Sequence, residues 1–193
     1  MKKDTVNIIF GDSIAYGLGD TECFGWLNRL RKKDEKLLKE FFLNLSIPGQ
    51  TSSEIVERFE FELKRRFNYV DEFKLFFSFG IKDALKLGYD KTYLKIFEHN
   101  IIELIKIAKN YTTNIHFLGL LNVNETIRVG YKRENIDTIN ECLETLCHKY
   151  SINFINMFDV INIKDLCDGL HPNELGHEKI SQYLYESLYK NSK

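Results

Sequence analysis

Residues 5–17 read TVNIIFGDSIAYG, a short apolar run that leads into a turn flanked by Gly11 and Gly17. The apolar run over residues 5–10 predicts a strand, and Ser13 then falls in the turn or at the start of the first helix. A serine at that place has a free backbone N–H, and the helix dipole there favours negative charge. This suits a nucleophile that also donates to an oxyanion. A serine that merely caps a helix is also common there, so this stretch alone leaves both interpretations open.

The rest of the chain repeats the alternation of strand and helix. Apolar runs predict further strands at residues 41–45, 73–79, 115–118 and 152–155. Helices are predicted over residues 24–33, 51–66, 92–110, 134–150 and 173–189. Near-continuous apolar strands favour a parallel sheet covered by helices on both faces, which is a three-layer α/β/α fold of about five strands. No repeat or linker interrupts the pattern, so residues 1–193 are predicted to form one domain.

Glycines follow four of the predicted strands, at Gly11, Gly49, Gly80 and Gly119. In open α/β sheets, ligands bind at the edge where the strands end. Glycine is favoured in such turns for conformational reasons alone. Turn chemistry does not, however, require a serine in one of these turns.

A second stretch with chemical character is DGLHPNELGH at residues 168–177. Asp168 precedes His171 by three residues in a tight turn, and Pro172 stiffens the chain just beyond it. A carboxylate that holds a histidine's tautomer and orientation is what general-base catalysis on a serine requires. Asp168 in an ordinary turn or cap is the alternative. The other histidines have no such acid, and His177 is interpreted as a packing or capping residue.

Composition excludes several classes of protein. The chain has 193 residues, 44% of them hydrophobic, with a formal net charge of −1, which gives no attraction to nucleic acid or anionic membranes. Of the four cysteines, Cys142 and Cys147 lie five apart on a predicted helix, which is poor disulfide geometry, and no pair has zinc-ribbon spacing; reduced, partly buried thiols are therefore expected. No stretch is long enough for a membrane span, and the apolar run after the basic N-terminus is too short for a signal peptide. A cytoplasmic protein is therefore expected.

Taken in order, these stretches resemble the SGNH, or GDSL-type, hydrolases. The matching motifs are Gly11-Asp12-Ser13 with Gly17, then NLSIPGQT at residues 44–51, then Gly80-x-x-Asp83, then Asp168-x-x-His171-Pro172 with Gly176-His177. The resemblance implies a flavodoxin-like fold with strand order 2-1-3-4-5. It also implies hydrolysis of a small carboxylic ester, with a short acyl or acetyl group, through an acyl-enzyme. A thioester or lysophospholipid would suit the same machinery, and no metal or organic cofactor is expected.

The same resemblance implies a role for each of these residues. Ser13 is expected to be the nucleophile, His171 the general base and acid, and Asp168 its orienting carboxylate. The oxyanion would be bound by the backbone N–H groups of Ser13 and Gly49 and by a side chain of the third motif. Residues 14–24 and 120–132 are expected to form the rim that selects the substrate.

The third motif departs from the family pattern. The family has Gly-x-Asn-Asp, whereas this chain reads Gly80-Ile81-Lys82-Asp83. Lys82 either donates to the oxyanion through its ammonium group, or points to solvent while Asp83 caps the following helix. Two rival functions stay open: a very slow or non-catalytic relative that binds a ligand or partner, and a nucleotide-binding module. Against the module, no Gly-x-Gly-x-x-Gly or Walker pattern follows any predicted strand.

Overall fold

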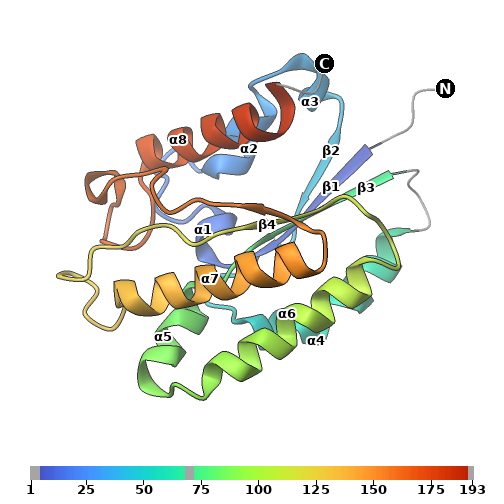
Figure 1. Ribbon diagram of the computed structural model, residues 1–193. Coiled ribbons are helices and arrows are strands. Elements are labelled where there is room, and N and C mark those ends of the chain that lie inside the picture. Colours follow the sequence, from blue (N-terminus) through green and yellow to red (C-terminus); the bar gives the residue numbers. More distant parts are fainter. Residues whose placement is uncertain (1–4, 68–71, 191–193) are drawn as a thin grey trace.

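The computed structural model of the chain describes residues 5–67 and 72–190. Within these residues a sheet of five parallel strands forms the centre of the molecule (Figure 1). The strands are β1 (Thr5–Gly11), β2 (Phe41–Asn44), β3 (Glu72–Ser78), β4 (Ile115–Leu118) and β5 (Asn153–Ile155). Their order in the sheet is β2-β1-β3-β4-β5. The expected parallel sheet and its strand order are therefore confirmed.

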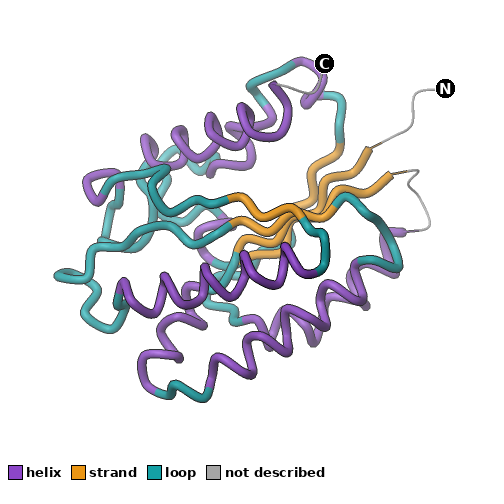
Figure 2. The backbone as a smooth tube through the Cα atoms, in the orientation of Figure 1, coloured by secondary structure: helices purple, strands orange, loops and turns teal. Residues whose placement is uncertain are grey.

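Helices cover both faces of this sheet, as Figures 1 and 2 show. On one face lie α1 (Ser13–Tyr16), α2 (Gly25–Arg31), α3 (Glu35–Leu38) and α8 (Glu174–Tyr185), and α8 continues into a π-helical turn, η2 (Glu186–Lys190). On the other lie α4 (Ser52–Phe67), α5 (Ile81–Tyr89), α6 (Tyr93–Ala108) and α7 (Arg133–Lys149). A short 3-10 helix, η1 (Ile163–Asp165), lies between β5 and α8. The three-layer α/β/α prediction is confirmed.

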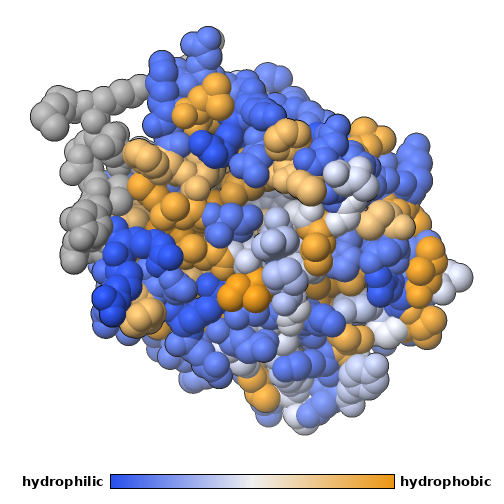
Figure 3. Space-filling view, turned by 180° about the vertical axis from the view of Figure 1, so that it is seen from behind, coloured by the Kyte–Doolittle hydropathy of each residue, from blue (hydrophilic) through white to orange (hydrophobic). Residues whose placement is uncertain are grey.

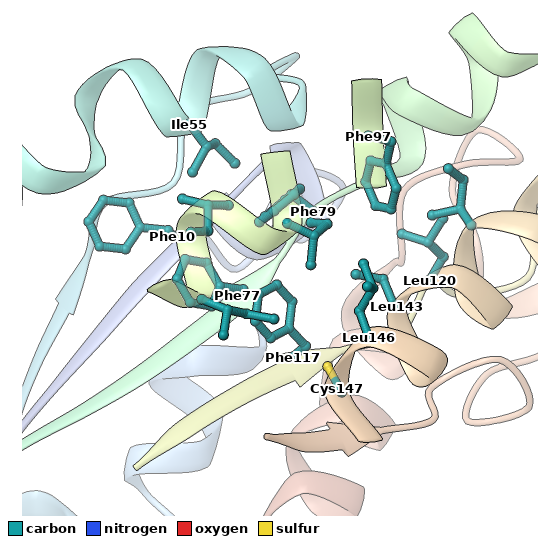
Figure 4. Packing of buried hydrophobic residues seen from close by; sticks show 14 of the residues in the cluster. Phe10, Ile55, Phe77, Phe79, Phe97, Phe117, Leu120, Leu143, Leu146 and Cys147 are labelled. Carbon is teal, nitrogen blue, oxygen red and sulfur yellow. The ribbon is translucent and has the colours of Figure 1, made fainter. Parts of the chain in front are cut away.

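The alternation of side chains along the strands builds two cores. Phe10 of β1, Phe77 of β3 and Phe117 of β4 all point to the face covered by α4 to α7 (Figure 4). Their rings form a stacked row, with centroids 6.1 Å apart between Phe10 and Phe77 and 4.5 Å between Phe77 and Phe117. Ile9 and Phe76 point to the other face, toward α2 and α8. Since a one-residue slip would reverse every side chain, these rows fix the register of the strands that end at the site.

The structure adds short helices that the sequence pattern did not predict. In α5 the buried residues Ile81, Ala84 and Leu87 keep a three-residue spacing, but Lys82 and Gly88 interrupt the apolar signal. The helix is only 9 residues long, too short for periodicity to identify it securely. Helix α3 has 4 residues and a single buried one, Leu37. Of these, α5 matters for the site because it begins inside the third motif.

The cysteine prediction is only partly right. All four thiols are free, but Cys23 and Cys167 are exposed, whereas Cys147 is buried in α7. The two exposed thiols lie in loops at the end of the sheet rather than on a core-facing side of a helix. Among the described helices, none is both long and apolar enough to cross a bilayer. Viewed from behind, hydrophilic residues cover most of the surface, with apolar residues in smaller groups between them (Figure 3).

Candidate active site

Ser13 stands where β1 ends and α1 begins. Asp12 caps this helix, because its Oδ1 accepts a hydrogen bond from Ile14 N–H at 3.0 Å. Asp12 N–H also donates to the carbonyl of Ser78 at 3.2 Å, which ties the end of β1 to the end of β3. Ser13 is 6% exposed, and its N–H belongs to the first turn, where helical N–H groups have no partner within the helix. The backbone thus fixes the serine and leaves a donor beside its hydroxyl.

The turn that carries Asp168 and His171 is closed by hydrogen bonds of its own. Cys167 N–H donates to the carbonyl of His171 at 2.9 Å, and Leu166 forms a bridge with Pro172. Asp168 Oδ1 accepts from Leu170 N–H at 3.0 Å and from His171 N–H at 2.8 Å. The carboxylate is therefore held against the backbone of the histidine that it faces.

These two segments meet across 158 residues of sequence. His171 Nε2 lies 3.0 Å from Ser13 Oγ, and His171 Nδ1 lies 2.8 Å from Asp168 Oδ2. Burial alone would raise the pKa of Asp168, but hydrogen bonds from the His171 N–H, the His171 ring and Leu170 N–H outweigh it and hold that pKa well below its usual range. The side chain is thus a carboxylate, which favours the imidazole tautomer with a proton on Nδ1 and an acceptor at Nε2. The structure brings Ser13, His171 and Asp168 together, while their catalytic roles stay predictions.

The loop between α1 and α2 packs against the turn that carries Asp168 and His171 and against the start of α8. His177 is fully buried, and its Nε2 lies 3.1 Å from the carbonyl of Leu18. Burial lowers the pKa of His177, so its ring is neutral and donates this hydrogen bond near neutral pH. At Gly19, where φ is +95°, a side chain would come within 2.3 Å of the Pro172 carbonyl. Glu174 accepts from Thr21 N–H at 3.2 Å. His177 therefore has the structural role that the sequence suggested.

The second motif places Gly49 in a turn after β2. Asn44 holds this turn beside α1, because its Nδ2 donates to the Ala15 carbonyl at 2.9 Å and its Oδ1 accepts from Ser46 N–H at 3.1 Å. Gly49 has φ +84°, a left-handed conformation that glycine adopts without strain. Its N–H makes no hydrogen bond with the part of the chain that the structure describes. Gly49 thus has a free N–H donor in the turn that follows β2.

In the third motif Asp83 is fully buried, whereas Lys82 is half-buried. Asp83 is fully buried and accepts from Ser52 Oγ at 2.6 Å, from Ser52 N–H at 3.1 Å and from the Tyr93 hydroxyl at 3.0 Å. One alternative from the sequence was that Asp83 caps the following helix; in the structure its carboxylate instead binds the first residue of α4. Lys82 Nζ lies 6.0 Å from the centre of the Tyr131 ring. Within residues 5–67 and 72–190 its ammonium has no hydrogen-bond or ion-pair partner, and no contact joins it to Ser13.

Asp12 is a buried acid next to the serine that the sequence analysis did not single out. It is 2% exposed and borders a cavity of about 20 Å³, which Ser78, Ile81 and Leu120 also line. Burial raises the pKa of Asp12 to about 7; the N–H of Ile14 opposes the rise, and nearby Asp83 adds to it. Its position next to a glycine and a serine gave no signal of this environment, which comes from packing.

Arg128 was also missed, although it lies in the loop expected to form the rim. Its Nε donates to the carbonyl of Asp168 at 3.0 Å, and its guanidinium is paired with the Asp168 carboxylate. Among the described residues, no group of three or more His, Cys, Asp or Glu side chains could hold a metal ion. The absence of a cofactor stays a prediction.

Comparison with known protein families gives a match over most of the chain. The model of the GDSL-like Lipase/Acylhydrolase family matches residues 9–179, which include all four motifs. Among curated protein sequences, none matches the chain significantly.

Solved structures share the fold at low sequence identity. A member of the lipolytic protein G-D-S-L family from Veillonella parvula is 18% identical, with 96% of this chain and 99% of that chain covered at a TM-score of 0.75. The acetyl xylan esterase AlAXEase is 15% identical, with 95% and 99% covered at a TM-score of 0.77. The psychrotrophic esterase EstA from Pseudoalteromonas sp., solved with monoethylphosphonate as inhibitor, is 19% identical, with 95% and 96% covered at a TM-score of 0.73. With the family match over most of its length, the chain belongs to the GDSL-like Lipase/Acylhydrolase family.

Proposed function

We propose that residues 1–193 act as one catalytic domain, a serine esterase that hydrolyses a carboxylic ester through an acyl-enzyme. The observation that carries this proposal is the hydrogen-bonded series from Ser13 Oγ to His171 Nε2, at 3.0 Å, and from His171 Nδ1 to Asp168, at 2.8 Å. Such a series activates a hydroxyl that is unreactive by itself. The ester-hydrolysing family to which the chain belongs supports the same reaction class.

The proposed reaction has two halves. Ser13 Oγ attacks the ester carbonyl while His171 Nε2 takes its proton, and Asp168 stabilises the imidazolium that forms. The tetrahedral intermediate collapses as His171 gives this proton to the leaving alcohol, which leaves an acyl group on Ser13. Water then attacks the acyl-enzyme with His171 again as base, and the acid product leaves with Ser13 restored.

The proposed oxyanion site combines the N–H groups of Ser13 and Gly49 with the Lys82 ammonium. The Ser13 N–H lies at the start of α1, the Gly49 N–H lies in the turn after β2, and Lys82 lies in the first turn of α5. Among the described residues the ammonium has no hydrogen-bond or ion-pair partner, and four rotatable bonds let it move inward from its place over the Tyr131 ring. A positive charge in a site shielded from water stabilises developing negative charge strongly.

The proposed substrate is a small ester with a short acyl or acetyl group. An acetyl xylan esterase is among the proteins of the same fold, which supports this choice. Exposed apolar side chains at Tyr16, Leu18, Ile127 and Val129 lie in the two segments expected to form the rim. They favour an apolar group on at least one side of the ester bond.

One observation favours a second candidate, a very slow or non-catalytic relative that binds a ligand. Lys82 takes the place of the asparagine in the motif, and its ammonium lies over the Tyr131 ring. If it stays there during the reaction, the oxyanion has one donor fewer. Removing one such donor from a hydrolase costs about 10²- to 10³-fold in rate.

The test is hydrolysis of nitrophenyl esters of increasing acyl length by wild type, Ser13→Ala and Ser78→Ala. Ser78 is a matched control because it ends the neighbouring strand, opposite Gly11. The proposal expects turnover by wild type and by Ser78→Ala, and a loss of about 10⁴-fold or more in Ser13→Ala. Equal activity in wild type and Ser13→Ala refutes the nucleophile, and wild type without turnover of any ester favours the second candidate.

A further inference from the structure

The loop after β4 docks directly on the turn that carries Asp168. We call residues 124–131 the docked segment. Asn124 N–H donates to the carbonyl of Gly169 at 2.8 Å, and a side chain at Gly169 would come within 2.9 Å of Ile127 Cβ. Arg128 N–H donates back to the carbonyl of Asn124 at 2.9 Å, which closes the segment on itself. The segment is therefore fixed to the turn by its backbone, and Arg128 projects from it.

Arg128 makes two contacts with Asp168. Its Nε donates to the backbone carbonyl at 3.0 Å, and a terminal nitrogen donates to Oδ2, the oxygen that also faces His171 Nδ1 at 2.8 Å. The other oxygen, Oδ1, already accepts from Leu170 N–H and His171 N–H. Both oxygens thus have donors on two sides, and rotation of the carboxylate would break several hydrogen bonds at once.

We propose that Arg128 is a positioning residue for the Asp168–His171 pair. It holds Oδ2 toward the imidazole and offsets part of the carboxylate charge that the imidazole faces. The inference rests on the proposed function, in which a neutral His171 is the general base. A carboxylate alone stabilises the imidazolium, and a second positive charge on the same carboxylate opposes this. Arg128 thereby adjusts the pH range in which Ser13 is activated.

The groups around His171 come from its own turn, from α1, from the loop before α2 and α2 itself, from the start of α8 and from the docked segment. Ser13, Asp168 and His177 interact with His171 itself. Arg128 and Cys167 interact with Asp168, Glu174 with Cys167, and Asp20 and Arg29 with His177. The Lys82 ammonium, proposed for the oxyanion site, is a further positive charge.

Most of these groups are either paired with a partner or neutral near neutral pH. Asp20 is paired with Arg29 at 3.0 Å, and Glu174 accepts from Thr21. Burial lowers the pKa of His177 and raises the pKa of Cys167, so both are neutral near neutral pH. The charge whose removal bears most directly on the pair is therefore that of Arg128, which touches the carboxylate itself.

The experiment compares Arg128→Met, which removes the charge but keeps a similar stem, with Arg128→Lys, which keeps the charge but loses the planar fork. The first readout is NMR titration of the His171 ring, whose signal is identified by its loss in His171→Gln. In Arg128→Met the titration midpoint should move upward by about half a pH unit to one unit, whereas Arg128→Lys should stay close to wild type. This readout needs no substrate, so it tests the inference even if the proposed function fails.

The second readout is the pH profile of ester hydrolysis. The acid limb of kcat/KM should move upward in Arg128→Met by the same amount, and kcat should fall about tenfold because Asp168 is less well held. Arg133→Met is the matched control, since Arg133 lies five residues further on, pairs with Asp137 at 3.5 Å and lies over the Phe158 ring rather than against Asp168. It should match wild type in both readouts.

Arg128→Gln provides a second neutral variant if Arg128→Met does not fold, as judged by its melting curve. A titration midpoint and acid limb that stay at the wild-type position in a folded neutral variant overturn the inference. An inactive wild type whose His171 titration still responds to Arg128 overturns the proposed function and leaves the positioning role in place.

Discussion

Two turns at the same edge of the sheet use an aspartate in opposite ways. In the turn over residues 168–172, Asp168 faces His171 and is joined through it to Ser13. In the turn over residues 80–83, Asp83 points into the protein and binds Ser52 and Tyr93. Hydrogen bonds hold the pKa of Asp168 below its usual range, whereas burial raises the pKa of Asp83.

The two aspartates at this edge of the sheet therefore have different roles: Asp168 is proposed to act in catalysis, and Asp83 holds the structure together. Asp168 is one-third exposed, and its partners orient it toward a reacting group. Asp83 joins the start of α5 to the first residue of α4 and to α6, so it fixes the helices beneath the site. Substitution of the first should change rate more than stability, and substitution of the second should change stability more than rate.

The largest effect is expected for Asp168→Asn. The amide keeps the shape of the side chain but loses the charge that stabilises the imidazolium and selects the tautomer. Turnover should fall by roughly 10²- to 10⁴-fold. The melting temperature should stay close to that of wild type, since the turn keeps its backbone hydrogen bonds. Steady-state kinetics and calorimetry check this, and an unchanged rate would remove Asp168 from the mechanism.

Lys82 lies next to the structural Asp83, in the turn over residues 80–83, yet it is proposed to bind the oxyanion. Lys82→Ala should lower kcat by about 10²- to 10³-fold. Lys82→Asn, which restores the family's amide, should keep much of the activity and move the acid limb of the pH profile upward as the positive charge is lost. Kinetics of the three proteins across pH decide between these roles. Wild-type turnover in Lys82→Ala would make the ammonium a surface charge without a catalytic role.

Asp83→Ala tests the scaffold aspartate. The change leaves Ser52 N–H, Ser52 Oγ and the Tyr93 hydroxyl without their shared acceptor in a buried place. The free energy of unfolding should fall by roughly 2–4 kcal/mol. In the folded fraction, kcat should fall less than in Asp168→Asn. Urea unfolding together with kinetics below the transition checks both points, and a stability equal to wild type contradicts the scaffold role.

Asp12→Asn is expected to have the smallest effect, one that depends on pH. Folding raises the pKa of Asp12 from 3.8 to about 7. Between these two pH values, Asp12 is therefore protonated in the folded chain and ionised in the unfolded chain. The contribution of Asp12 to stability is fully present below the lower value and is lost as pH rises through the higher one.

Relative to Asp12→Asn, wild type should therefore lose roughly 2.5 kcal/mol of stability between about pH 5 and about pH 8, since each unit of pKa difference corresponds to about 1.4 kcal/mol. Urea unfolding of both proteins at the two pH values measures this. A difference that is constant with pH shows that Asp12 titrates normally in the folded chain.

Much of the fold was predictable because the strands are continuous apolar runs. Residues 115–118 were predicted as a strand with the bounds that β4 has, and the strand order followed from the resemblance. Ser13, Asp168 and His171 were predicted to meet, since each lies in a motif at the end of the sheet. The roles of these residues, the substrate and the cytoplasmic location stay predictions.

Other features depend on contacts between distant segments that no local pattern encodes. The pairing of Arg128 with Asp168 joins residues that are 40 positions apart, in a loop without periodicity. The burial of Asp12 comes from side chains of β3, α5 and the loop after β4. The inward direction of Asp83 depends on how α4 and α6 pack against α5. In each case the residue type was visible in the sequence, but its partner was not.

The most direct test of Ser13 as the activated nucleophile is labelling with a fluorophosphonate, with intact mass and peptide mapping as the readout. The reagent forms a covalent bond only with a serine that is activated as a nucleophile. We expect one adduct, on Ser13, in wild type and in Ser78→Ala, with none in Ser13→Ala and much slower labelling in His171→Gln. An adduct on another serine, or equal labelling of wild type and His171→Gln, would contradict the triad.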